Sequence, residues 1–166
     1  MNLDNIDNIP THPLVVHLPI VLVPLTLICV LVFSLRKKWH AHYAIPVAAL
    51  SFVALIGSYL AKESGEGLEE RVRETSLMEK HTELGDQFFT IALLMFLVVL
   101  VWAFVGWYFR NKSDDESKYK YLRIGICVVA VAVVSYASFA VYKVGHSGAK
   151  SVWHNTPAGE LESGGD

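Results

Sequence analysis

Residues 13–35 read PLVVHLPIVLVPLTLICVLVFSL, a run of 23 residues without Lys, Arg, Asp or Glu. A helix needs about 20 mainly apolar residues to cross the hydrocarbon layer of a bilayer. Three further stretches share this property: 43–61, 87–109 and 124–142. None of the four shows the polar stripe of a helix on a soluble domain. The sequence therefore predicts an all-α fold, a four-helix transmembrane bundle with spans at about 13–35, 43–61, 87–109 and 121–144.

The composition and the missing motifs argue against several classes of function. Hydrophobic residues make up 53% of the chain and the net charge is −2, so there is no basic surface of the kind that binds nucleic acid. No phosphate-binding glycine loop, nucleophile elbow or zinc-protease motif occurs. Asp4 and Asp7 precede the first apolar run and no Lys or Arg does. Because a signal peptide begins with a positive segment, we expect this run to be retained as a span.

Basic residues gather in two short connections, between spans one and two and between spans three and four: Arg36, Lys37, Lys38, Arg110, Lys112, Lys118, Lys120 and Arg123. Short loops rich in Lys and Arg stay in the cytoplasm. Both termini and the longer second connection are therefore expected on the outer side. Ser76 followed by Glu79 forms a capping-box pattern, which predicts a third helix that starts above the outer face.

Small residues and glycines mark the remaining features of the predicted domain, 1–154. Small side chains recur every three or four residues along the second span, from Ala44 to Ala61. Such a seam allows close helix packing, although alanine is also simply common in apolar helices. Gly145 and Gly148 predict the end of the fourth helix near Val144. The segment 155–166 is acidic and glycine-rich, which predicts a disordered tail.

Five of the seven histidines fall on the predicted outer side: His12, His17, His81, His146 and His154. They come from three chain segments, yet the topology brings them to one level of a narrow bundle. An ionisable side chain at membrane depth is costly and so is a functional candidate. The alternative is that each histidine caps a helix end or forms a hydrogen bond with a neighbouring carbonyl at the membrane interface. His40 and His42, in the basic connection, are expected to be solvated.

Two kinds of ligand fit such a cluster. A haem b needs one or two imidazoles from different segments, an apolar slot and nearby polar groups, and bundle cores commonly hold cofactors on facing helices. His17 and His81 are the first choice of axial pair, with His12 and His146 next. Zinc or copper also accepts imidazole, and acidic residues of the third helix could complete that site: Glu79, Glu83 and Asp86.

The opening of the first span, THPLVVHLPIVLVPL, resembles the membrane family catalogued as domain of unknown function 2231. That family begins His-Pro-Leu-x-Val-His, an apolar residue and Pro, and the matching positions are His12, Pro13, Leu14, Val16, His17 and Pro19. The closing GHSGAKSVWHN is similar to the family's glycine-rich end, with Asn155 where the family usually has glycine. The resemblance implies a bacterial inner-membrane protein and does not settle an activity.

Three hypotheses of function follow. The leading one is a membrane electron-transfer protein that binds haem b and exchanges electrons with a partner protein or a quinone. The second is a non-catalytic accessory subunit of a larger respiratory or energy-converting complex. The third is a zinc- or copper-binding membrane protein with its site on the outer face.

Overall fold

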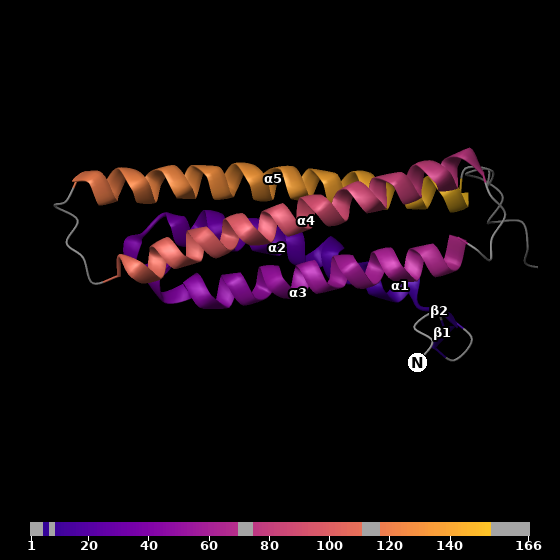
Figure 1. The fold of residues 1–166 in the computed structure, drawn as a ribbon, viewed down its shortest axis with the longest axis horizontal. Coiled ribbons are helices and arrows are strands. Elements are labelled where there is room, and N and C mark those ends of the chain that lie inside the picture. The colour runs from indigo at the N-terminus through magenta and orange to yellow at the C-terminus, as the bar shows by residue number, and fades with distance from the viewer. Residues whose placement is uncertain (1–4, 7–8, 70–74, 111–116, 154–166) are drawn as a thin grey trace, which may run out of the picture.

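The computed structural model describes residues 5–6, 9–69, 75–110 and 117–153. The chain begins with two short antiparallel strands, β1 (Asn5–Ile6) and β2 (Ile9–Pro10). Five helices follow: α1 (His12–Val15), α2 (His17–Ser34), α3 (Lys37–Glu69), α4 (Ser76–Tyr108) and α5 (Ser117–Trp153). Figure 1 shows α2 to α5 lying roughly parallel to one long axis.

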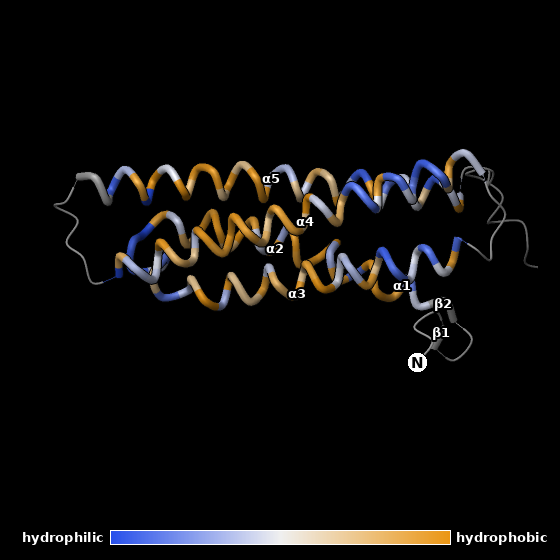
Figure 2. Tube along the Cα trace, in the orientation of Figure 1, coloured by the Kyte–Doolittle hydropathy of each residue, from blue (hydrophilic) through white to orange (hydrophobic). Residues whose placement is uncertain are grey.

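Four helical segments are long and apolar enough to cross a membrane: His12–Ser34, Lys37–Glu69, Ser76–Tyr108 and Lys120–Trp153. The predicted four-helix transmembrane bundle is confirmed. Figure 2 shows the apolar residues in the middle of the bundle and the hydrophilic ones toward both ends. At 1.5 Å per residue, the 33 residues of α4 span about 50 Å, well beyond the roughly 30 Å of a hydrocarbon layer. Its first three turns precede the apolar segment 87–109.

The four long helices form a ring in which each contacts two neighbours. The helix α3 packs against α2 and α4, and α5 packs against the same two. The diagonal pairs are therefore α2 with α4, and α3 with α5. In sequence order the bundle consists of two helical hairpins, the first made of α1 to α3 and the second of α4 and α5. Each hairpin thus supplies one member of each diagonal.

The first span is broken just before Pro19 and continues through Pro24. Pro19 has no N–H to donate to the carbonyl of Val15, four residues earlier, and α1 ends at Val15. The second helix segment begins at His17 and continues through Pro24. His12 is the first residue of α1 and Pro13 lies in its first turn, where a missing N–H costs nothing.

Two helix ends can be compared with those predicted from the sequence. The helix α4 begins at Ser76 as predicted, but the cap is Thr75, whose side chain accepts from the Met78 N–H at 3.3 Å. The helix α5 does not stop near Val144. It continues through Gly145 and Gly148 to Trp153, so the predicted helix end is wrong. The reason is tertiary contact, which overrides weak propensity: Gly148 packs against a histidine of α4.

The core combines many small and β-branched side chains with a few large ones, chiefly Trp102 and Met95. Inward positions recur every three or four residues on each helix, and the seam of α3 contributes Ala44, Ser51, Ala54 and Ser58, all buried. Large apolar side chains such as Leu94, Leu97, Phe104 and Phe139 point outward. This is the arrangement of a bundle whose outer surface meets lipid, because small inward residues let helix backbones approach closely.

Candidate functional site: two histidines that meet at one end of the bundle

The end of the bundle formed by α1, the last turns of α3, the first turns of α4 and the last turns of α5 is called the histidine end below. The opposite end, which carries Arg36, Arg110 and Arg123, is called the basic end. In Figure 1 the histidine end lies on the right and the basic end on the left. The apolar middle of the four long helices lies between them (Figure 2).

His12 crosses from α1 onto the last turns of α3. Its Nδ1 lies 3.0 Å from the carbonyl oxygen of Ala61 and 3.2 Å from Ser64 Oγ. The ring rests against Gly65, where an added Cβ would lie 3.1 Å from His12 Cε1. A side chain at this position would crowd the ring. Gly65 therefore makes the space that His12 occupies.

His81 makes the matching contacts from α4 onto α5. Its Nδ1 lies 2.9 Å from Ser147 Oγ. The ring rests against Gly148, where an added Cβ would lie 2.9 Å from His81 Cε1 and 3.3 Å from Nε2. The continuation of α5 past Gly145 places both residues under this ring. A helix that ended near residue 144 could not provide them.

The rings of His12 and His81 lie next to each other. Their centroids are 6.2 Å apart and their planes are at 79°. The histidines come from the diagonal pair α1–α2 and α4, and the two glycines come from the other diagonal, α3 and α5. One level of the bundle therefore carries a histidine at two opposite corners and a glycine at the other two.

Hydrogen bonding fixes the tautomer of His12. The Ala61 carbonyl, 3.0 Å from His12 Nδ1, can only accept, so Nδ1 is the N–H donor and Nε2 carries the lone pair. Ser147 Oγ lies 2.9 Å from His81 Nδ1 and 2.8 Å from the Val144 carbonyl. A hydroxyl both donates and accepts, so this contact fits either tautomer of His81.

The other predicted site residues lie elsewhere. His17 is exposed, and its Nδ1 donates to the Pro13 carbonyl of the preceding turn at 2.6 Å. His146 is exposed and stacks on Tyr142 with centroids 6.0 Å apart. His154 and the tail 155–166 lie outside the described residues. The first-choice axial pair, His17 and His81, is not brought together: His17 is exposed, and His81 lies beside His12, which was a second choice.

Two further observations limit the chemistry at this end. Among the described residues, no group of three or more His, Cys, Asp or Glu side chains could hold a metal ion. A cavity of about 410 Å³ lies beside the start of α4, and its walls are Glu69, Thr75, Ser76, Met78 and Glu79. The predicted acidic ligands of the third helix have other neighbours: Asp86 pairs with Lys62 at 2.6 Å, Glu83 accepts from Gln87 at 3.1 Å, and Glu79 lines this cavity.

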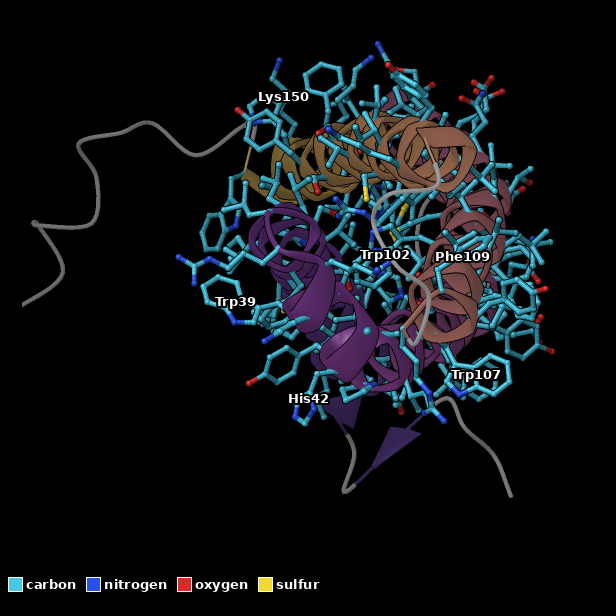
Figure 3. The ribbon with its side chains drawn as sticks, turned by 90° about the vertical axis from the view of Figure 1, so that its left-hand side faces the viewer. Trp39, His42, Trp102, Trp107, Phe109 and Lys150 are labelled. Carbon is cyan, nitrogen blue, oxygen red and sulfur yellow. The ribbon has the colours of Figure 1, made fainter. Side chains whose placement is uncertain are left out.

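At the basic end, the expectation of a solvated His40 is wrong. His40 is fully buried, stacks on Trp102 at 4.3 Å between centroids, and donates from Nε2 to the Trp102 carbonyl at 2.8 Å. The ring fits only because Gly106 has no side chain, since an added Cβ would lie 2.5 Å from His40 Cδ2. Figure 3 shows Trp102 in the interior, whereas His42 points outward.

The sequence reasoning missed the residues that hold the two rings. They are Ser64 with Gly65 and Ser147 with Gly148, a Ser-Gly step toward the histidine end of the second helix of each hairpin. The two identical dipeptides were a visible signal. Their role depends on contacts with distant histidines: Ser64 contacts His12, 52 residues away, and Ser147 contacts His81, 66 residues away. Composition and spacing do not reveal such contacts.

Comparison with known proteins agrees with the fold. No curated protein and no solved structure matches the chain. Residues 8–156 match the family model described as a predicted membrane protein, DUF2231. The match contains all four spans, both histidines and both Ser-Gly steps. It covers nearly the whole sequence, and the chain therefore belongs to this family of membrane proteins.

Proposed function

We propose that the protein is a membrane electron-transfer protein that binds haem b between His12 and His81. The observation that carries the proposal is the meeting of these two rings from opposite corners of the bundle, with centroids 6.2 Å apart. A metal–imidazole bond is about 2 Å long and the nitrogen lies about 1 Å from the ring centre, so two imidazoles on opposite faces of one metal have centres about 6 Å apart. The observed separation fits this requirement.

The other two corners hold Gly65 and Gly148, and the two imidazole rings occupy the space beside them. Bundles commonly hold cofactors on side chains from facing helices. When bound, a haem would supply one-electron redox chemistry, and the chain's own task would be to present the two imidazoles from opposite corners.

The number of ligands favours haem over a bare metal ion. Structural zinc takes four protein ligands, and the described residues offer two imidazoles without a third His, Cys or carboxylate group. A haem iron obtains four nitrogens from the macrocycle and needs only the axial pair. The proposal therefore revises the axial assignment to His12 and His81 and leaves His17 and His146 out of the site.

The position of the site suggests its partners. With the basic end in the cytoplasm by the positive-inside rule, the histidine end and both termini face the outer side of the inner membrane. A haem there lies at the water–lipid boundary, within reach of a soluble redox protein or of a quinone from the bilayer. We therefore propose a class of redox partner, a soluble redox protein or a quinone.

The test is the visible spectrum of the protein purified in mild detergent from cells supplied with haem. A Soret band with sharp α and β bands after dithionite reduction is expected. His12→Ala and His81→Ala should abolish or strongly weaken these bands. His17→Ala and His146→Ala are matched controls, since both remove an exposed histidine from the same end, and they should leave the spectrum unchanged.

Two outcomes contradict the proposal. A colourless wild-type protein with full haem supply would exclude haem binding, and metal analysis would then separate a copper or zinc site from an accessory subunit that binds no metal. Loss of the spectrum in His17→Ala, with retention in His12→Ala, would show that the axial pair is wrong.

A further inference from the structure

Two arginines of the basic end stand at the edges of apolar runs. Arg36 directly follows the uncharged run 13–35, and Arg110 directly follows the uncharged run 87–109. Both side chains are exposed. In a bilayer, the first charged position after an apolar run lies at the level of the lipid headgroups. Each arginine is therefore placed at the depth of the lipid phosphates.

Each of these arginines lies over the ring of an exposed tryptophan three residues away. The Arg36 Cζ atom is 4.8 Å from the centre of the Trp39 ring, and the Arg110 Cζ atom is 5.7 Å from that of Trp107. Figure 3 shows the two tryptophans at separate places on the rim of the bundle. Because a cation is attracted to the face of an indole ring, this contact holds each guanidinium in a preferred position. The basic end thus carries two similar Arg–Trp pairs.

Neither guanidinium of these pairs is neutralised by a described residue. In the described part of the chain, the carboxylates that form ion pairs are Glu66 and Asp86, and both pair with Lys62 toward the histidine end. Among the same residues, Arg36 and Arg110 have no acidic partner and donate no side-chain hydrogen bond. A guanidinium over a ring keeps its N–H donors, whose fork matches two oxygens of a phosphate. An anion from outside the chain is the partner that each pair fits.

We propose that the Arg36–Trp39 and Arg110–Trp107 pairs are two binding sites for the phosphate headgroups of anionic membrane phospholipids. A lipid such as phosphatidylglycerol has no ammonium group to offset its phosphodiester charge, so it gains most from an unpaired basic residue at the membrane surface. Its acyl chains would lie along outward apolar side chains such as Phe104, whose ring centroid is 6.2 Å from that of Trp107. This inference goes beyond the proposed function and does not depend on haem.

A third arginine at the same end has a different task. Arg123 directly precedes the uncharged run 124–142, so it lies at a similar edge. Its side chain is half-buried, and its Nη1 donates to the Ser34 carbonyl at the end of α2, at 3.4 Å. Arg123 therefore joins α5 to α2 inside the bundle. The depth of an arginine is not enough for a headgroup site, which also needs an exposed guanidinium held by a ring.

Native mass spectrometry of the full-length protein can count the lipids that each variant retains. The protein is reconstituted in an equal mixture of phosphatidylglycerol and phosphatidylcholine and then extracted in mild detergent. We expect the wild type to retain up to two phosphatidylglycerol molecules per chain. Arg36→Gln and Arg110→Gln should each lose one of them, and the double variant should lose both. Circular dichroism should show an unchanged fold, because both side chains are exposed.

Variants that keep the charge test whether the pair itself makes the site. Arg36→Lys and Arg110→Lys keep a cation but lose the planar fork that matches a phosphate. Trp39→Leu and Trp107→Leu keep the arginine but remove the ring beneath it. Each of these changes should lower the affinity of one site for phosphatidylglycerol by about 2–5-fold, the size of an exposed cation–π contact.

Lys38→Gln and Lys120→Gln are the matched controls. Both lysines are exposed at the same end, and neither forms a ring contact among the described residues. These variants should retain both lipids. The inference is wrong if they lose as much lipid as the arginine variants, which would indicate diffuse charge, or if the arginine variants retain as much as the wild type. It is also wrong if phosphatidylcholine is retained equally or if inorganic phosphate displaces the lipids. None of these results bears on haem binding at the histidine end.

Discussion

Replacement of Gly106 by alanine should destabilise the bundle strongly, although alanine is the better helix former. The added Cβ would lie 2.5 Å from His40 Cδ2 and 2.6 Å from Nε2, about 1 Å closer than ordinary van der Waals contact. His40 has no exposed surface and is stacked on Trp102. The ring therefore has no free space to move into, and either the ring or the α3–α4 pair must shift.

The magnitude follows from three contributions. Overpacking of a filled core costs about 1–3 kcal/mol. Displacement of the His40 ring removes the acceptor from its buried Nε2–H, which costs about 1–3 kcal/mol more. The helix preference for alanine over glycine returns up to about 1 kcal/mol. We expect a net loss of about 2–4 kcal/mol in the free energy of unfolding, which for a chain of this size lowers the Tm by roughly 5–15 °C.

Thermal unfolding in detergent, followed by circular dichroism, measures this loss. Gly125→Ala is the matched control because Gly125 lies in a span of the same bundle and an added Cβ there would meet nothing within 4 Å. That variant should keep or slightly raise the Tm. The double variant His40→Ala/Gly106→Ala should be more stable than the sum of the single changes predicts, by about 1–3 kcal/mol, because the new methyl group then enters the space of the missing ring.

The reasoning would be refuted if the Gly106 and Gly125 variants had the same Tm within error. It would also fail if removal of the His40 side chain gave no relief in the double variant. Either result would mean that the ring is not held against Gly106, and that its burial has another cause.

Three further predictions concern other parts of the bundle. Trp102→Phe removes the Nε1–H bond to Ser34 Oγ at 3.0 Å, and it should cost about 1 kcal/mol, measured by the same thermal unfolding. Lys62→Ala breaks the ion pair with Asp86 between α3 and α4; because exposed ion pairs contribute little, the Tm should fall only slightly, and the difference should vanish at high salt. A C-terminal alkaline phosphatase fusion should be active and a fluorescent protein fusion dark, if the histidine end faces the outer side as the basic connections predict.

The sequence predicted the number and order of the spans because apolar length is a local property. Residues 87–109 contain no charge and must be covered by lipid or protein whatever their partners are. The start of α4 was also local, since Thr75 and Ser76 both belong to the short polar segment that caps it. Such features depend on a few neighbouring residues and can be identified without a structure.

The errors all involve a histidine packed against a distant glycine. His40 stands among basic residues in the sequence, which indicates solvent, but Gly106 opens an interior space for it. Gly148 is a helix breaker by propensity, but the ring of His81 covers it and α5 continues. The choice of His12 rather than His17 depends on the rotation of α1 relative to α3, which the break at Pro19 sets. None of these contacts has a short-range signature.

The location of the two imidazoles on separate hairpins has a consequence for biogenesis. The ribosome releases the first hairpin before the second, so His12 enters the membrane with only half of its site. A ligand held by both rings would join the hairpins to each other, and it could bind only after α4 and α5 had inserted and docked. Ligand loading would then report the completion of membrane insertion, and a chain arrested after the third span would remain unloaded.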